Sequence, residues 1–232
     1  MVEPRVIVAL DFTDADTAKT FVNRVTPAQC RLKVGMELFT AAGPSLVEHL
    51  VVRGFDVFLD LKYHDIPTTV ERACSRAAGL GVWMLNVHAL GGKRMLMAAR
   101  EAIERSTHRP LLVGVTLLTS HGDDELTEIG LEGGTERQVE RLADIVKDAG
   151  LNGVVCSPAE AAMLRRRFGK KFVLVTPGVR QAGDAVDDQR RTRTPAEAVR
   201  EGADFLVIGR PVTRAPDPAA VLDAINREIQ VQ

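Results

Sequence analysis

Two carboxylates and one ammonium group follow a single, largely apolar run. Asp60, Lys62 and Asp65 come directly after residues 55–59, which read Phe-Asp-Val-Phe-Leu. If that run is a strand that continues through Lys62, Asp60 and Lys62 lie on one face because strand residues alternate between faces. Asp65 can return to the same pocket from a loop. Burial of such charges costs free energy, but an enzyme without a cofactor needs charges of this kind to deliver a proton.

Two more charged side chains occur in or directly after apolar runs. Lys33 lies inside Leu-Lys-Val-Gly at 32–35, and Asp11 ends the run Val-Ala-Leu at 8–10. A lysine in a strand normally points outward. If helices cover the outer side of the strands, the inner mouth of the fold is the better place for Lys33. Asp11 has an alternative role in capping a helix together with Thr13 and Asp14.

Two glycine-containing segments have the composition of phosphate-binding loops. The first is Gly209-Arg210-Pro211, where backbone N–H groups and a planar guanidinium suit an anion. The second starts at Thr176 and continues as a long polar loop to Arg191. We interpret this loop as a lid that closes over phosphate, with Arg180 as the gripping residue. The alternatives are a surface arginine after a turn and a plain disordered loop.

Several motifs of other enzyme classes are missing from the sequence. The five histidines form no H-x-H or H-E-x-x-H pattern, and His88 is expected to be a hydrogen-bonding scaffold rather than a metal ligand. The three cysteines are far apart and form no C-x-x-C pair. No nucleophile elbow, Walker motif or dinucleotide fingerprint occurs. We therefore expect no metal and no organic cofactor.

Eight short apolar runs alternate with segments of helical pattern. Runs of this kind are typical of parallel strands that are covered on both faces. They lie at 5–11, 31–35, 55–62, 82–88, 111–118, 153–157, 172–177 and 205–209. Helices are predicted between and after them at 13–25, 44–53, 68–78, 92–105, 136–149, 158–168, 196–201 and 218–229.

Eight strand-and-helix units in 232 residues predict an α/β fold, a closed (β/α)₈ TIM barrel that forms one domain over residues 1–232. A doubly wound open sheet is the alternative, but it typically uses fewer strands. Active sites of such barrels lie at the C-terminal ends of the strands. Polar and charged residues collect at these ends, namely Asp11, Lys33, Asp60, Lys62, His88, Thr119, Ser157, Pro177, Gly178, Gly209 and Arg210.

The composition is that of an ordinary globular protein, with 45% hydrophobic and 26% charged residues. A net charge of −1 and 4% aromatic residues indicate neither a nucleic-acid partner nor a membrane surface. No apolar stretch approaches the roughly 20 residues that span a bilayer. Without a secretory leader pattern or a disulfide framework, the expected location is the cytoplasm.

Taken together, these segments resemble the bacterial type of the orotidine 5′-phosphate decarboxylase family over essentially the whole chain. The element D-x-K-x-x-D-I-P is highly specific when it is joined to K-V-G upstream and G-R-P downstream. The resemblance is carried by residues 8–11, 32–35, 58–67, 86–88, 118–120, 176–180 and 207–211.

The resemblance implies a homodimer that converts orotidine 5′-monophosphate to uridine 5′-monophosphate and CO₂, the last step of de novo pyrimidine synthesis, without a metal or cofactor. It implies that Lys62 is the proton donor and that Lys33, Asp60 and Asp65 complete an alternating charge array. It further implies that Asp65 and Thr69 reach into the partner subunit's site, so that each active site is shared.

The resemblance also implies the groups that bind the substrate. Asp11 and Lys33 would hold ribose hydroxyls, and Thr119 would lie near the pyrimidine. The phosphate, or the lid over it, would be held by Arg180, Gln189, Gly209 and Arg210.

Two other functions remain as alternatives. A sugar-phosphate decarboxylase of the same superfamily would bind Mg²⁺ through an acidic residue near the strand that carries Asp60. Here Phe58 stands two residues before Asp60, which favours the pyrimidine enzyme. A catalytically silent barrel that binds a nucleotide or a protein is the second alternative, and the intact charge array argues against it.

Overall fold

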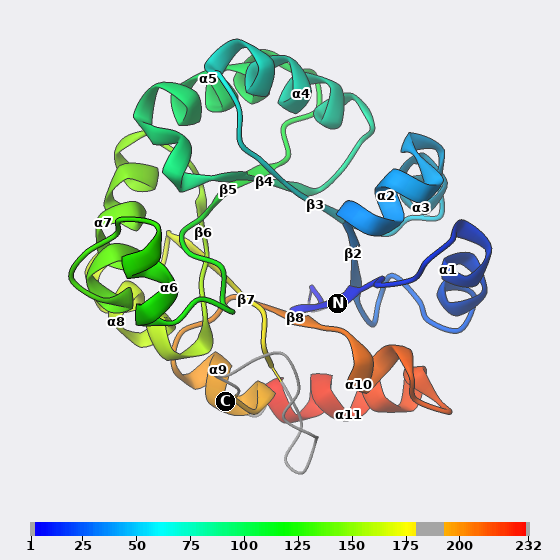
Figure 1. Cartoon of the computed structure of the whole chain (residues 1–232). Helices are drawn as coiled ribbons and strands as arrows, with labels where there is room; N and C mark the ends of the chain where they lie inside the picture. Colours follow the sequence, from blue (N-terminus) through cyan, green and yellow to red (C-terminus); the bar gives the residue numbers. More distant parts are fainter. Residues whose placement is uncertain (1–2, 180–192, 231–232) are drawn as a thin grey trace.

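The computed structural model of the chain describes residues 3–179 and 193–230 and shows a closed barrel of parallel strands (Figure 1). Each strand pairs with the next in sequence order, and β8 pairs with β1. The strands are β1 Val6–Ala9, β2 Arg31–Gly35, β3 Val57–Tyr63, β4 Met84–His88, β5 Leu111–Val115, β6 Gly153–Val155, β7 Val173–Thr176 and β8 Phe205–Ile208. The predicted (β/α)₈ barrel is confirmed, and a single domain over 1–232 stays a prediction.

Helices surround the barrel on its outer side (Figure 1). They are α1 Ala15–Val22, α2 Met36–Ala42, α3 Pro44–Val52, α4 Pro67–Gly79, α5 Gly92–Arg105, α6 Asp123–Glu128, α7 Thr135–Asp148, α8 Pro158–Phe168, α9 Pro195–Arg200, α10 Arg210–Thr213 and α11 Pro218–Gln230, with a 3₁₀ turn at Ala89–Gly91. Three of these, α2, α6 and α10, were not among the predicted helices. None of the helices in the described ranges has the length and apolar character that crossing a bilayer requires.

The helix boundaries follow from local capping. The helix expected over 13–25 begins two residues later, because Asp14 rather than Thr13 is the N-cap: its Oδ1 accepts the backbone N–H of Thr17 at 2.8 Å. The helix expected over 68–78 begins one residue earlier, with Pro67 in the first turn of α4 and Ile66 as the N-cap. Most predicted strands are longer than the observed ones. The apolar run at 111–118, for example, leaves the sheet after Val115.

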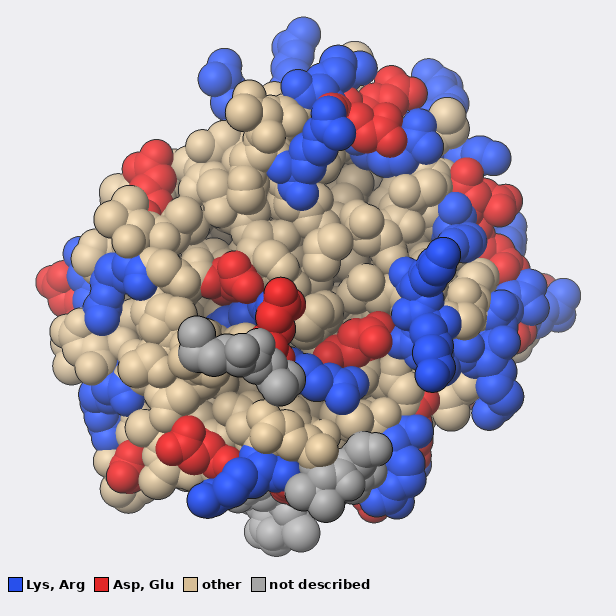
Figure 2. Space-filling model, turned by 180° about the vertical axis from the view of Figure 1, so that it is seen from behind, with Lys and Arg blue, Asp and Glu red and all other residues tan. Residues whose placement is uncertain are grey.

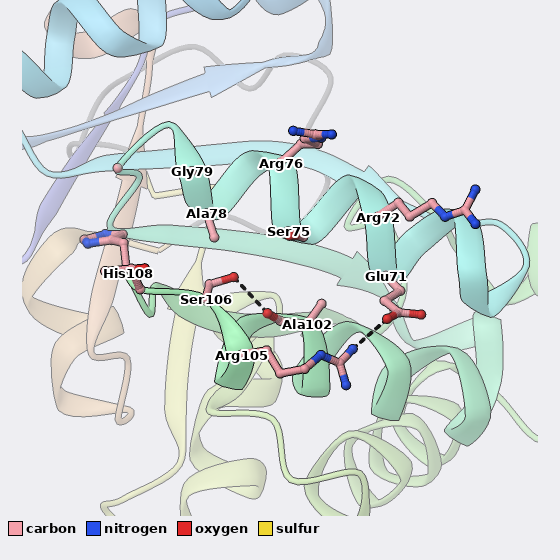
Figure 3. Close-up of a pocket in the computed structure, with 12 residues that line it drawn as sticks. Glu71, Arg72, Ser75, Arg76, Ala78, Gly79, Ala102, Arg105, Ser106 and His108 are labelled. Carbon is pink, nitrogen blue, oxygen red and sulfur yellow. Dashed lines mark hydrogen bonds and ion pairs between the residues drawn. The ribbon is translucent and has the colours of Figure 1, made fainter.

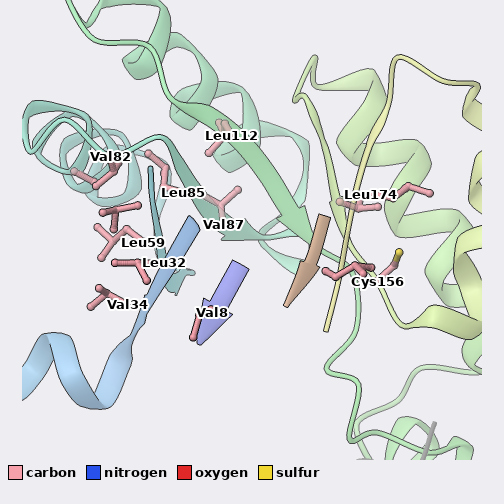
Figure 4. Close-up of a cluster of buried hydrophobic side chains, with 14 of the residues drawn as sticks. Val8, Leu32, Val34, Leu59, Val82, Leu85, Val87, Leu112, Cys156 and Leu174 are labelled. Carbon is pink, nitrogen blue, oxygen red and sulfur yellow. The ribbon is translucent and has the colours of Figure 1, made fainter. Parts of the chain in front are cut away.

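Strand alternation divides the apolar residues into an inner and an outer core. The inner set fills the barrel and is Ile7, Ala9, Phe58, Met84, Val113, Val115, Val155, Val175 and Val207. The other side of each strand packs against the helices, and Figure 4 shows part of this larger cluster, including Val8, Leu32, Leu59, Leu85, Leu112 and Leu174. Both faces of every strand are therefore buried, which explains why the strands read as continuous apolar runs.

The N-terminal end of the barrel is closed by Arg31, whose side chain is only 2% exposed. Its guanidinium lies 4.2 Å from the ring centre of Trp83 and 5.0 Å from that of Phe205. It also pairs with Asp56 at 3.0 Å and Glu3 at 2.9 Å, and it donates to the carbonyl of Pro4. The guanidinium is thus enclosed between aromatic rings and hydrogen-bonded on its edges.

Charged side chains of both signs occur side by side on the surface. In the view from behind, acidic and basic side chains lie together near the middle of the face, and further basic side chains gather along its edge (Figure 2). This mixture agrees with a net charge of −1 for the whole chain.

Candidate active site

A cavity of about 380 Å³ opens at the C-terminal ends of the strands. Its polar lining comes from Asp11, Lys33, Asp60, Lys62, Thr119, Ser120 and Arg210, and its apolar lining includes Phe58, Val115, Leu117, Leu118, Val155 and Val207. The backbone of Pro177, Gly178 and Gly209 completes the wall. The end of the run at 111–118 lies here, so its last apolar residues line the cavity instead of extending β5.

Four of the predicted site residues form a chain of alternating charge across the mouth. Lys62 Nζ lies 2.8 Å from Asp60 Oδ1, and Lys33 Nζ lies 3.3 Å from Asp60 Oδ2. Lys33 Nζ is also 3.4 Å from Asp11 Oδ1. Asp60 thus receives one ammonium group on each oxygen. The prediction that Asp60 and Lys62 share a face is confirmed, and Lys33 points into the mouth as expected.

The two central groups of this chain are held in their charged forms. Burial acts to raise the pKa of Asp60, but the positive charges of Lys33 and Lys62 outweigh it and leave that pKa below its usual range. Burial acts to lower the pKa of Lys33, but Asp60 and Asp11 outweigh it and leave that pKa raised. Lys62 is the more accessible ammonium, with 27% of its side chain exposed against 12% for Lys33.

The backbone at Lys62 is unusual. Its φ of +50° makes it the one residue other than glycine, within the described ranges, that adopts the left-handed region. The pairing of β3 with β4 shifts here: Leu59 aligns with Leu85, but Tyr63 aligns with Val87. Four steps along β3 therefore match two along β4. The extra residues form a bulge, and this bulge carries Asp60 and Lys62.

Asn86 on β4 faces this bulge and was not predicted to have a role of its own. Its side chain is fully buried. Its Nδ2 donates to Asp60 Oδ1 at 2.7 Å, and its Oδ1 accepts the backbone N–H of Lys62 at 2.8 Å. The available signal was a polar amide inside the otherwise apolar strand Met84–His88, which normally requires hydrogen-bond partners.

Asp65 and Thr69 do not reach the cavity of their own chain. Both are exposed, and neither lines the mouth. The carboxylate of Asp65 accepts the backbone N–H of Ile66 at 2.6 Å. The interpretation that Asp65 returns to the pocket of the same chain is therefore wrong. The chain turns outward after β3 so that Pro67 can start α4, and this turn carries Asp65 away from Lys62.

The remaining predicted binding residues divide into two groups. Thr119, Gly209 and Arg210 line the cavity, with Gly209 next to Asp11 and Arg210 opening α10. Arg180 and Gln189, together with the predicted lid, lie outside the described residues.

His88 behaves as the predicted scaffold. It lies at the end of β4, where its Nδ1 accepts the backbone N–H of Leu90 at 3.4 Å and its ring stacks on His64 at 5.3 Å. Burial, with smaller effects from His64 and Lys62, lowers the pKa of His88 to about 4. His88 is therefore neutral near pH 7. Within residues 3–179 and 193–230, no group of three or more His, Cys, Asp or Glu side chains could hold a metal ion.

A larger hollow of about 960 Å³ lies between α4 and α5, away from the mouth. There Arg105 is hydrogen-bonded to Glu71 at 2.6 Å, and the guanidinium groups of Arg72 and Arg76 extend from α4 away from α5 (Figure 3). The cationic groups do not converge on a common point. The mouth of the barrel, where charged groups do converge, is the better candidate for chemistry.

Comparison with known proteins identifies the family of the chain. The model of the Orotidine 5′-phosphate decarboxylase / HUMPS family matches residues 4–225. The orotidine 5′-phosphate decarboxylase of Laribacter hongkongensis is 63% identical over 222 residues, which cover 95% of this chain and 91% of that protein. That of Nitrosospira multiformis is 56% identical over 230 residues, with 99% and 95% covered.

A solved structure shows the same fold. The orotidine 5′-phosphate decarboxylase of Lactobacillus acidophilus superposes with a TM-score of 0.88 at 38% identity, covering 98% of this chain and 99% of that one. The family match includes all eight described strands of the barrel, among them β3, which carries Asp60 and Lys62. The chain therefore belongs to the orotidine 5′-phosphate decarboxylase family.

Proposed function

We propose that Lys62 is the proton donor in the reaction of this chain, the decarboxylation of orotidine 5′-monophosphate to uridine 5′-monophosphate in pyrimidine biosynthesis. The reaction follows from membership of the family and from relatives of that name at 56–63% identity over nearly the full length. The observation that carries the role of Lys62 is the 2.8 Å contact of its ammonium group with Asp60, at the wall of the cavity.

Loss of CO₂ leaves an electron pair on the ring carbon to which the carboxylate was attached. An ammonium group fixed beside that carbon stabilises the developing negative charge before it transfers a proton. Asp60 fixes Lys62, and its second oxygen is held by Lys33 at 3.3 Å, so the three groups are arranged before substrate binds. The bond between the ring carbon and the carboxylate breaks, its electron pair stays on the ring carbon, and CO₂ departs. That pair then takes a proton from Nζ of Lys62 to form the new C–H bond, which leaves the Lys62 amine neutral.

The substrate phosphate and ribose would occupy the opposite side of the cavity. Arg210 and the backbone at Gly209 are suited to phosphate oxygens, since a guanidinium offers two parallel donors. Asp11 and Lys33 would hold ribose hydroxyls and Thr119 would contact the pyrimidine, and all three residues line the cavity. Arg180 and Gln189 complete the predicted phosphate grip. Binding energy from the phosphate can be used to organise the reacting end, so it affects turnover as well as affinity.

We further propose a homodimer with shared active sites. Three large apolar side chains are exposed directly after neighbouring strands: Met36 after β2, Ile66 after β3 and Leu90 after β4, at 56%, 64% and 39% exposure. Exposed apolar side chains that follow three neighbouring strands suit contact with a second copy. Asp65 and Thr69 flank Ile66 in sequence, so a partner seated there would receive both in its cavity. The second carboxylate beside Lys62 would then be that of Asp65 from the other subunit.

The described cysteines, Cys30, Cys74 and Cys156, are buried free thiols. This supports the proposal that the chain works in a reducing compartment such as the cytoplasm.

The direct test is the fall in ultraviolet absorbance as orotidine 5′-monophosphate is consumed by the purified protein. We expect turnover that is unchanged in excess chelator, because no role is assigned to a metal. Turnover of a sugar phosphate that stops on chelation, with no turnover of the nucleotide, would instead support the Mg²⁺-dependent alternative.

Sharing of the site is tested by mixing two inactive variants. Lys62→Ala and Asp65→Ala protomers, exchanged by mild denaturation and refolding, should recover part of the activity, because one site in the mixed dimer keeps both groups. Absence of recovery after exchange has been verified by differential tagging would argue against a composite site.

A further inference from the structure

We infer that Asn86 is a positioning residue for the reaction: its amide holds the Lys62 backbone in the left-handed conformation and one oxygen of Asp60 in line with the Lys62 ammonium. The inference rests on the role proposed for Lys62 and extends it to a residue that does not line the cavity.

The bulge in β3 creates the need for such a residue. Between Leu59 and Tyr63 the regular ladder with β4 is interrupted, so backbone groups in this stretch lose their usual strand partners. A buried N–H without a partner destabilises the folded state, because it loses its hydrogen bond to water and gains none. Asn86 supplies the missing acceptor, since its Oδ1 lies 2.8 Å from the backbone nitrogen of Lys62.

The same contact supports an unfavourable conformation. A residue with a Cβ at positive φ is strained, and it persists only where its surroundings fix it. With its backbone in this conformation, Lys62 has its Nζ 2.8 Å from Asp60 Oδ1. Loss of the Asn86 contact would allow Lys62 to relax toward an ordinary strand conformation and move its ammonium group.

The second half of the amide acts on Asp60. Asp60 Oδ1 accepts from Asn86 Nδ2 at 2.7 Å and from Lys62 Nζ at 2.8 Å, while Oδ2 faces Lys33. The amide can serve both neighbours because it has a donor and an acceptor, and each is placed opposite the complementary group. A carboxylate of similar size can serve only the Lys62 N–H, and an alkyl group can serve neither neighbour.

Substitution by aspartate separates the two contacts. In Asn86→Asp the Lys62 N–H keeps an acceptor, but Asp60 loses a donor and gains a like charge. Asp60 is then faced by Lys33 from β2, by Lys62 on β3 and by the new carboxyl group from β4, with Asp11 behind Lys33. When the introduced carboxyl group takes up a proton it becomes a donor to Asp60 and imitates the amide.

We expect kcat of Asn86→Asp to be roughly 100-fold below that of the natural protein at pH 8, because small displacements of a reacting group cost about this much. KM should change by no more than about threefold, since Asn86 touches no substrate. The ratio of the two kcat values should shrink as the pH falls toward 5. Asn86→Ala should lose as much activity without this recovery. For Asn86→Asp, a ratio of the natural kcat to the variant kcat that stays constant with pH would overturn the inference. A kcat within about threefold of the natural value in either variant would also overturn it.

A matched control is available at another position of the barrel. The Oδ1 of Asn152 accepts the backbone N–H of Leu112 at 2.8 Å, which is the same kind of bond at the opposite end of the strands. Asn152→Ala should lower the melting temperature without changing kcat or its pH profile.

Hydrogen exchange tests the inference without any substitution. In the natural protein the Lys62 amide should exchange as slowly as the amides of the β3 ladder, and rapid exchange would overturn the inference even if a variant failed to fold. If Lys62→Ala is inactive while the Asn86 variants are not, the role of Asn86 fails and that of Lys62 stands.

Discussion

The two ends of the barrel each hold buried charge, but they hold it in different ways. At the N-terminal end, Arg31 is 2% exposed and lies between Trp83 and Phe205, with carboxylates at its edges. At the C-terminal end, Lys33, Asp60 and Lys62 border an open cavity of about 380 Å³. The first arrangement leaves no space for another molecule. The second leaves one side of the charged groups accessible to a molecule bound in the cavity.

The residue types match these two situations. A guanidinium is planar, stacks on aromatic rings and keeps its proton, so it suits a closed structural contact. An ammonium group on a flexible stem can transfer a proton, so it suits a reacting site. The difference teaches that buried charge alone does not identify an active site. What identifies it is charge with an accessible side, held by neighbours that fix its position. Four predictions test this comparison.

The strongest test removes the ammonium group at the mouth. Lys62→Ala should lower kcat/KM by about four orders of magnitude or more, because both the proton donor and the stabilising charge are lost. The urea midpoint should change far less than the activity, because Asp60 keeps Lys33 and Asn86 as partners in the variant. Absorbance assays and urea unfolding measure the two effects. Near-normal turnover in a folded Lys62→Ala protein would contradict the assigned role, and Lys62→Arg serves as the control that keeps the charge.

The second test concerns the phosphate side of the same mouth. Arg210→Ala should lower kcat/KM for orotidine 5′-monophosphate by roughly 100-fold, the loss expected for a charged hydrogen bond. The reaction of the unphosphorylated nucleoside should barely change. Comparison of the two substrates gives the measurement. Equal losses with both would show that Arg210 supports the fold of the mouth rather than binding phosphate.

The third test changes the closed end. Arg31→Met should reduce the free energy of unfolding by about 3 kcal/mol, because stacking on two rings and several buried hydrogen bonds are lost. At 25 °C kcat should stay within about twofold of the natural value. Urea unfolding and steady-state assays on the same preparation separate the two. A large fall in kcat with an unchanged midpoint would remove the distinction between the ends.

The smallest effect concerns pH. The pKa of Lys33 is raised in the folded protein, so its charge stabilises the fold. This contribution is fully present below the pKa that lysine has in an unfolded chain, about 10.4, and it is lost as the pH rises through the pKa of Lys33 in the folded protein. The lowered pKa of Asp60 gives a contribution that is present above about pH 4 and is lost as the pH falls through the folded value.

Lys33→Met isolates the alkaline branch. The difference in urea midpoint between the natural protein and this variant should be constant from pH 7 to about 9. Above pH 10 the midpoint of the natural protein should fall relative to that of the variant. No change in this difference up to pH 11 would mean that Lys33 gains nothing from Asp60 and Asp11 in the folded state.

The sequence predicts the barrel well, because strands that are buried on both faces appear as apolar runs at any position of the sheet. It also predicts that Lys33, Asp60 and Lys62 gather at the mouth, because each stands in or at the C-terminal end of an apolar run. The unpredicted helices α2, α6 and α10 span four to seven residues. Helices this short carry little periodicity, and two of them directly follow a strand or its terminal glycine.

The finer features of the site depend on contacts between distant segments. The left-handed Lys62 and the role of Asn86 arise from the register of β3 against β4, which a single strand's sequence does not encode. The position of Asp65 depends on the turn into α4, and the role proposed for it depends on a second chain. Local patterns therefore predict which residues gather at the mouth, and tertiary pairing decides how each is oriented.

Closure of the sheet has a consequence for how copies of this protein meet. Each of the eight strands in the described residues has a neighbour on both sides, so none presents the open row of amide and carbonyl groups that lets foreign strands add on and aggregates grow. The proposed dimer would therefore be held by side chains rather than by strand pairing. If it forms as proposed, a mutation that impairs it is expected to lie in the segments that follow β2, β3 and β4, a short distance from the reacting groups.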